Sequence, residues 1–257
     1  MISHHKKINM RLDLFLVEKG YFKTRSKAKL ALDEGQVLVN GNKEKASYDA
    51  KESDKIELIN VNPYVSRGGL KLEGAINSFR LDFNDKVILD IGASTGGFTD
   101  CSLKHGARLV YAVDVGTNQL DESLKNNPKV ISYEKTNIKD IKKLDNEIDY
   151  LVMDVSFVSI EHLLPSIDHL ITDNNALITL IKPQFELGHM NMKNGIVKDK
   201  KLHMKVLNNV FEELKLYNLG IYKLIESPIL GGSGNKEFLA LIKRGINLNI
   251  NLNTVLK

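Results

Sequence analysis

The chain has 257 residues, 42% of them hydrophobic, which is enough to bury one large core and a smaller second one. Its net charge of +4 is too small to indicate a partner by itself. The single cysteine, Cys101, excludes a disulfide framework and fits a reducing compartment, so we expect a cytoplasmic protein. No apolar run reaches the roughly 18 residues of a membrane helix, and the basic N-terminus lacks the apolar region of a secretory signal.

Residues 1–60 predict a small α+β domain. A helix in "NMRLDLFLVEKGYF" is expected to end at Gly20. A second helix in "TRSKAKLALDEG" has Thr24 as a candidate N-cap and Gly35 as the residue that follows its C-terminus. The pair Asn40-Gly41 predicts a tight hairpin, and "DKIELI" supplies a returning strand.

The positive charge of this domain is concentrated at its start. Residues 1–29 carry eight lysines and arginines against two acidic residues. Arg25, Lys27 and Lys29 lie at the start of the second predicted helix, where side chains and helix N-terminus both favour phosphate. A nucleic-acid surface is one interpretation and a solvated helix face is the other, and charge alone does not decide between them.

From residue 61 onward the pattern changes. "VNPYVSRGGL", residues 61–70, is typical of a linker, and "LKLEGAINSF" predicts a helix that carries Lys71. The remainder alternates buried-strand runs with helical stretches, which predicts a doubly wound, mostly parallel α/β sheet. The last run, "EFLALIKR", is expected to lie antiparallel beside "ALITLI".

A candidate cofactor loop follows the first strand of this sheet. "LDIGASTGGFTD" places Asp90 before the glycines, and Asp114 ends the next strand, where a carboxylate suits ribose hydroxyls. A dinucleotide is one interpretation, but the loop is not G-x-G-x-x-G. The early acid favours S-adenosylmethionine, with Asp90 near its amino group.

Asn137 follows the third strand, where its side chain would face an adenine; an asparagine in a turn is the alternative. The complete set of candidate cofactor-binding residues is Asp90, Gly92, Ser94, Gly96, Gly97, Asp114, Asn137 and Asp154.

Four charged residues are expected at the ends of different elements. Lys182 follows the apolar run "ALITLI" directly, and Asp154 lies among apolar neighbours, so each needs a partner of opposite charge. Lys71 and Glu237 complete an alternating cluster. Such a cluster could be a structural ion network, or it could align and deprotonate a ribose 2′-hydroxyl for methyl transfer. No metal is expected, because the seven histidines show no ligand spacing.

Nearly the whole chain resembles one family. "TRSKAKLALDEGQVLVNG" is similar to the RNA-binding module of the ribosomal protein S-four type. With "YVSRGGLKL", "LDIGASTGGFTD", "DVSF", "KPQFELG" and "GGSGNKEF", the order of motifs resembles the TlyA (hemolysin A) family of ribosomal RNA 2′-O-methyltransferases, which have an FtsJ-like catalytic domain. Tyr64 stands where that family often has Trp.

The resemblance implies a function and a site. It implies S-adenosylmethionine-dependent 2′-O-methylation of cytidine in ribosomal RNA, with ribosomal RNA or subunits as partners and neither metal nor membrane. It also implies an RNA-binding domain at 1–60, a linker at 61–70 and a Rossmann-like methyltransferase domain at 71–257. The implied catalytic tetrad is Lys71, Asp154, Lys182 and Glu237, and the implied RNA-binding residues are Arg11, Arg25, Lys27, Lys29 and Arg67.

Two other classes of protein stay open at this point. A membrane-lytic protein would need a lytic amphipathic helix, and "KLHMKVLNNVFEELKLYNL" is amphipathic, although such helices usually pack on a sheet. A non-catalytic ribosome-assembly factor would keep the fold without the chemistry. The sequence does not predict an oligomeric state.

Overall fold

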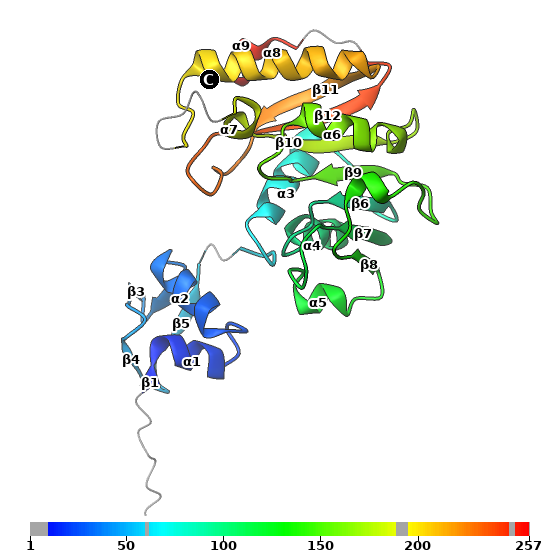
Figure 1. Ribbon diagram of the computed structural model, residues 1–257. Helices are drawn as coiled ribbons and strands as arrows, with labels where there is room; N and C mark the ends of the chain where they lie inside the picture. The colour runs from blue at the N-terminus through cyan, green and yellow to red at the C-terminus, as the bar shows by residue number, and fades with distance from the viewer. Residues whose placement is uncertain (1–9, 60–61, 189–194, 247–249, 257) are drawn as a thin grey trace, which may run out of the picture. The chain divides into compact units, whose positions relative to one another are not determined.

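The computed structural model describes residues 10–59, 62–188, 195–246 and 250–256, and the chain divides into two compact units, Met1–Pro63 and Tyr64–Lys257 (Figure 1). Tyr64, inside the predicted linker, is buried and packs in the core of the second unit. The division into a 1–60 domain, a 61–70 linker and a 71–257 domain stays a prediction.

The first unit has the predicted helices and hairpin. Its elements are β1 (Met10–Arg11), α1 (Leu12–Glu18), α2 (Arg25–Asp33), β2 (Val37–Val39), β3 (Asn42–Lys43), β4 (Asp49–Ala50) and β5 (Ile56–Leu58). The Thr24 side chain accepts a hydrogen bond from the Lys27 N–H and so caps α2. Asn40 and Gly41 both have positive φ, as a two-residue hairpin turn requires.

A buried carboxylate ties the two helices of this unit together. Asp13, 1% exposed, accepts hydrogen bonds from Arg11 Nε at 3.1 Å and from Arg25 Nε at 2.8 Å. The Arg11 guanidinium, assisted by Arg25, lowers the pKa of Asp13 to about 2 even though burial opposes the shift. Arg11 and Arg25, both predicted to bind RNA, therefore also hold the fold of this unit.

The second unit is a sheet with helices on both faces. Its strands are β6 (Val87–Ile91), β7 (Leu109–Val113), β8 (Val130–Tyr133), β9 (Tyr150–Met153), β10 (Ala176–Ile181), β11 (Leu219–Glu226) and β12 (Phe238–Arg244). Its helices are α3 (Gly68–Phe79), α4 (Gly97–Lys104), α5 (Glu122–Lys125), η1 (Ile138–Asp140), α6 (Ile160–Ile167), η2 (Asp168–Leu170), α7 (Pro183–Glu186), α8 (Lys200–Leu216) and α9 (Leu252–Val255).

The strands lie in the order β11-β12-β10-β9-β6-β7-β8. Strands β10, β9, β6, β7 and β8 are parallel, and β12 pairs antiparallel with β10 and with β11. The predicted mostly parallel α/β sheet with an antiparallel last strand is confirmed. Because β12 runs the opposite way, its first residue lies at the edge where the parallel strands end.

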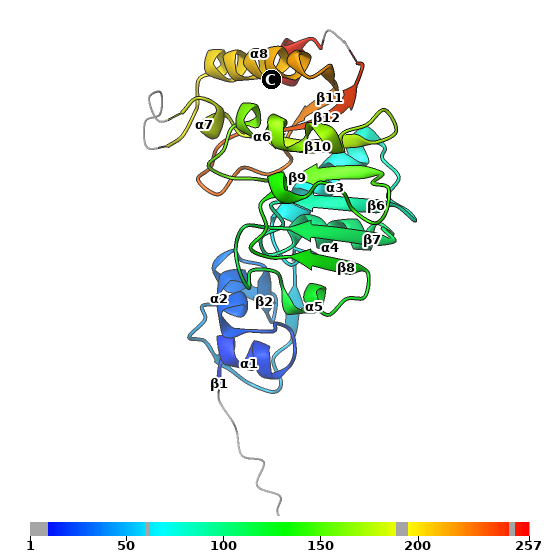
Figure 2. The same ribbon diagram turned by 45° about the vertical axis from the view of Figure 1, so that its right-hand side comes forward.

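Helices cover both faces of this sheet (Figures 1 and 2). Leu89 packs in a core with α6 and α8, while its neighbour Ile88 packs on the opposite face with α3 and α4. Burial on both faces explains why these strands are continuously apolar. The apolar side of the amphipathic helix α8, which includes Val206 and Leu207, is buried in the first of these cores.

Replacing Asp13 with Asn should destabilise the first unit by about 2 kcal/mol, because the charge-assisted hydrogen bonds from Arg11 and Arg25 lose their carboxylate. The lowered pKa also sets a pH dependence. The stabilisation is complete above pH ~4, the usual value, and is lost as the pH falls towards 2. In the Asp13→Asn variant, the backbone amides of α1 and α2 should exchange hydrogen faster than in the parental chain. The exposed control Asp33→Asn should leave them unchanged, and equal protection in both variants would contradict this role.

Candidate active site

A cavity of about 1060 Å³ opens at the edge where the parallel strands end. Its walls come from five places: the start of α3, the loop after β6, the segment after β9, the segment after β10 and the loop before β12. Ligands in open α/β sheets bind at this edge. The cavity therefore marks the candidate site.

The four predicted charged residues meet at this cavity. Lys71 Nζ lies 2.6 Å from Glu237 Oε2 and 3.8 Å from Asp154 Oδ2. Lys182 Nζ lies 2.5 Å from Asp154 Oδ1. The ion pairs thus form a chain in the order Glu237, Lys71, Asp154, Lys182.

Burial makes these ion pairs mutually dependent. Lys71, Lys182 and Glu237 are 8%, 6% and 3% exposed, and all three line the cavity. A buried charge without a partner is strongly destabilising, whereas a paired and hydrogen-bonded one is tolerated. The arrangement holds two ammonium groups and two carboxylates at fixed positions beside a space large enough for a ligand.

Lys182 is held where a strand changes into a helix. It is the N-cap residue of α7, and Pro183 occupies the first turn, where its missing N–H costs nothing. Lys182 Nζ also donates to Ser156 Oγ at 3.1 Å, so its ammonium is fixed by both Asp154 and Ser156.

Asp90 is fully buried and lines the cavity. Its Oδ2 accepts a 2.6 Å hydrogen bond from the Thr99 hydroxyl, and its Oδ1 has no hydrogen-bond partner among the described residues. Burial raises the pKa of Asp90 to about 7, with Asp154 and Asp114 adding to the rise and Thr99 opposing it. An unpartnered buried acceptor beside a cavity suits a cationic donor group of a ligand.

The glycines of the predicted cofactor loop are required by packing within the protein. A Cβ on Gly92 would lie 2.8 Å from Val155 Cγ1, and one on Gly97 would lie 2.3 Å from Ser66 Oγ. Gly96 has a φ of +92° and packs against Leu124, where a Cβ would lie 2.3 Å from Cδ1. Gly92 and Gly97 also line the cavity, so their backbone borders the space in which a ligand would bind.

Three predicted cofactor residues lie outside the large cavity: Gly96, Asp114 and Asn137. Asp114 accepts hydrogen bonds from the backbone N–H groups of Ser94 and Gly116, and with Ser94 it lines a separate small pocket. Asn137 caps η1 by accepting a hydrogen bond from the Lys139 N–H, as expected of an asparagine in a turn. It lines neither the large cavity nor the small pocket. Ser94 lines both pockets. The binding roles of these residues stay predictions.

The predicted RNA-binding residues lie in both units. Lys27 and Lys29 are exposed on α2, close to its capped N-terminus. Arg67 is exposed at the start of α3 and donates a hydrogen bond to the Leu230 carbonyl in the loop before β12.

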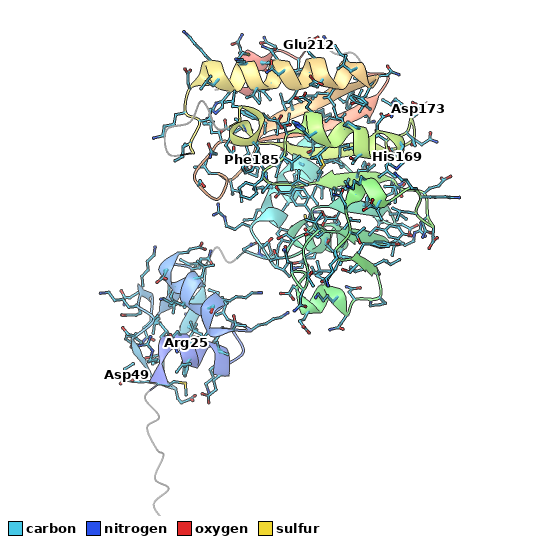
Figure 3. The ribbon with its side chains drawn as sticks, in the orientation of Figure 1. Arg25, Asp49, His169, Asp173, Phe185 and Glu212 are labelled. Atoms are coloured by element: carbon cyan, nitrogen blue, oxygen red, sulfur yellow. The ribbon has the colours of Figure 1, made fainter. Side chains whose placement is uncertain are left out.

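Sequence reasoning did not assign several residues of the cavity wall. Gln184 donates to Glu237 Oε1 at 3.2 Å and so extends the ion chain to α7. Phe157, 86% exposed and with a φ of +67°, lies with its ring 5.0 Å from that of Phe185, which Figure 3 labels. The motifs "DVSF" and "KPQF" contain these residues, but no spacing rule indicates contacts between them.

The described parts of the chain contain neither a cluster of metal-binding side chains nor a membrane-spanning helix. Within residues 10–59, 62–188, 195–246 and 250–256, no group of three His, Cys, Asp or Glu side chains could hold a metal ion. In the same ranges no helix is both long and apolar enough to cross a bilayer.

Comparison with known families gives the class of protein. Residues 64–244 match the family described as FtsJ-like methyltransferase, and residues 10–56 match the S4 domain. The chain belongs to the FtsJ-like methyltransferase family, and it carries an S4 domain in front. The class of enzyme predicted from the sequence is confirmed.

Full-length relatives narrow the comparison. The chain is 45% identical to "Hemolysin A" of Brachyspira hyodysenteriae, over 90% of this chain and 98% of that protein. It is 32% identical to the "16S/23S rRNA (cytidine-2'-O)-methyltransferase TlyA" of Mycobacterium tuberculosis, over 91% and 89% of the two chains. A Streptococcus thermophilus structure provisionally described as a hemolysin is 38% identical, with a TM-score of 0.74 over 97% and 94%. The predicted resemblance to the TlyA (hemolysin A) family is confirmed.

The buried pair gives a test that does not depend on activity. Lys71→Met should destabilise the second unit by about 3–5 kcal/mol, because Glu237 then stays buried without its cation. Lys71→Met combined with Glu237→Gln should recover at least half of that loss, because the uncompensated charge is removed. Urea denaturation followed by circular dichroism measures both. Equal stability of the single and double variants would contradict a coupled buried pair.

Proposed function

We propose that this enzyme transfers a methyl group from S-adenosylmethionine to the ribose 2′-hydroxyl of a cytidine in ribosomal RNA. The observation that carries the proposal is the ion chain from Glu237 to Lys182 at the wall of the cavity. Membership of the FtsJ-like methyltransferase family supports it, as does a relative named for cytidine-2'-O methylation of rRNA.

Residues around the loop after β6 fit the cofactor. Asp90 offers its unpartnered Oδ1 to the amino group of the methionine part. Asp114, which lines the small pocket that shares Ser94 with the large cavity, would bind the ribose hydroxyls. Gly92, Ser94 and Gly97 would lie against the cofactor, with Gly96 setting the turn into α4. When bound, S-adenosylmethionine supplies a methyl group already activated as a sulfonium.

The chain's own residues then act on the hydroxyl. Lys182 Nζ, fixed by Asp154 and Ser156, orients the 2′-hydroxyl. In its neutral amine form it receives the hydroxyl proton while the oxygen–methyl bond forms and the sulfur–methyl bond breaks. Lys71 and Glu237 hold Asp154 in place from the other side. Because all of these groups sit at the ends of packed elements, alignment requires little rearrangement during the reaction.

The S4 domain is proposed to bind the RNA. Lys27 and Lys29 present ammonium groups near the start of α2, a position that favours phosphate. Arg11 and Arg25 contribute through guanidinium edges that Asp13 leaves exposed. Arg67 would contact RNA beside the active site.

Lys182 provides the main test of the reaction. Lys182→Ala should lower methyl transfer to ribosomal RNA by about 100- to 10,000-fold, because a positioned proton acceptor is lost. S-adenosylmethionine binding, measured by calorimetry, should be unchanged. Lys182→Arg keeps the positive charge, but a guanidinium does not release its proton near neutral pH, so this variant should also be inactive. Transfer by Lys182→Arg at the parental rate would reduce Lys182 to an electrostatic support.

Asp90 should make cofactor affinity depend on pH. Its pKa of about 7 means that the carboxylate is ionised above pH 7 and protonated below it. The dissociation constant for S-adenosylmethionine should rise as the pH falls, by up to about fivefold between pH 7 and 6. Asp90→Asn should bind more weakly and lose this dependence. A dissociation constant for the parental chain that is constant from pH 8 to 6 would refute the assignment.

The RNA-binding surface is best tested by variants that leave Arg25 unchanged, because Arg25 also forms an ion pair with the buried Asp13. Lys27→Ala with Lys29→Ala should weaken RNA binding and reduce its salt slope by roughly 0.7–0.9 for each phosphate that the variant no longer neutralises. The matched control, Lys45→Ala with Lys51→Ala, removes two exposed lysines elsewhere in the same unit. If both double variants show the parental slope, the start of α2 is only a solvated face.

A further inference from the structure

Helix α6 begins without its ordinary cap. Ser159 is the N-cap residue, but its side chain makes no hydrogen bond to the backbone of the first turn. Its Oγ lies 2.6 Å from His162 Nδ1 instead. The Ile160 N–H donates to Glu186 Oε1 at 3.1 Å, so a carboxylate from α7, 26 residues further along the chain, takes the place of the cap.

Besides the Lys182–Asp154 ion pair, three further contacts join the segment after β9 to the segment after β10, and this bond is the outermost of them. Lys182 reaches Ser156 at 3.1 Å, the Phe185 ring lies 5.0 Å from that of Phe157, and Glu186 reaches Ile160. The residues that make these contacts occur in the same order along both segments. One segment carries Asp154 and the other carries Lys182, so the outer contact restricts how the two can shift relative to each other.

We propose that Glu186 is a positioning residue for methyl transfer: its acceptor oxygen caps α6 and thereby keeps Asp154 aligned with Lys182. This inference rests on the proposed function. Glu186 does not line the large cavity, so it acts through the two segments and not on the substrate. Its own side chain lines a separate cavity of about 170 Å³ next to α8.

The surroundings of Glu186 indicate that the acceptor matters more than the charge. Glu161 from α6 and Glu212 and Glu213 from α8 line the same small cavity, together with Asn209 and Val210, and no lysine or arginine does so among the described residues. Figure 3 labels Glu212 on α8. Burial raises the pKa of Glu186 to about 7, with Glu161 adding to the rise and the Ile160 N–H opposing it.

The raised pKa of Glu186 makes the stability of the folded chain depend on pH. Because the pKa in the folded chain lies above the usual value, stability decreases as the pH rises from about 4.5 to about 7. Glu186→Gln removes the free-energy cost of burying an ionised carboxylate and keeps an oxygen that can accept the hydrogen bond from the Ile160 N–H. It should therefore be at least as stable as the parental chain at pH 8. Glu186→Leu has a similar size and lacks the acceptor.

The test compares these two variants in methyl transfer to ribosomal RNA at pH 8, with the concentration of S-adenosylmethionine varied up to saturation. Glu186→Leu should lower kcat about 10- to 100-fold without changing KM for S-adenosylmethionine, since small misplacements of reacting groups cost rates of this order. Glu186→Gln should stay within about threefold of the parental chain. The matched control Glu161→Leu, which removes a carboxylate from the same cavity but no cap, should stay within about twofold.

Hydrogen exchange provides the second readout. Amides at the start of α6 should exchange faster in Glu186→Leu than in Glu186→Gln. A kcat for Glu186→Leu within twofold of the parental value would overturn the inference, as would equal losses in both Glu186 variants. A parental chain that transfers no methyl group would instead overturn the proposed function, so the two failures are distinguishable.

Discussion

The cost of burying charge is the constraint on which the active site depends. Lys71, Lys182 and Glu237 are almost completely buried, and each is tolerable only while its partner is present. The partners come from α3, from the ends of β9 and β10 and from the start of β12. The antiparallel insertion of β12 beside β10 is therefore essential, because it brings Glu237 to the edge where Lys182 emerges.

Two other groups are held in costly states near the same edge. Asp90 and Glu186 both have a pKa raised to about 7 by burial, and among the described residues neither forms a hydrogen bond or an ion pair with a lysine or arginine. Strong perturbation of this kind concentrates at functional sites. Asp13 in the S4 domain shows the opposite case, since two arginines lower its pKa and stabilise the fold.

Sequence reasoning reached the fold because the local signals agree with it. Apolar runs predicted the strands, and Thr24, Gly35 and the Asn40-Gly41 pair predicted a cap, a helix end and a turn. Lys182 and Asp154 were identifiable because they follow apolar strands, whereas Lys71 and Glu237 were added as partners of opposite charge that the family resemblance implies. What could not be predicted depends on contacts between distant segments. The bond from Glu186 to Ile160 and the role of Arg25 on Asp13 have no periodic signal.

Mapping ribose methylation on ribosomal RNA tests the central claim most directly. RNA from unmodified subunits would be incubated with S-adenosylmethionine and either the parental chain or Lys182→Ala, and 2′-O-methyl groups would be located by their resistance to alkaline cleavage. The account predicts new 2′-O-methylation at cytidine with the parental chain and none with Lys182→Ala. Methylation on a base, or no ribose methylation with the folded parental chain, would contradict it.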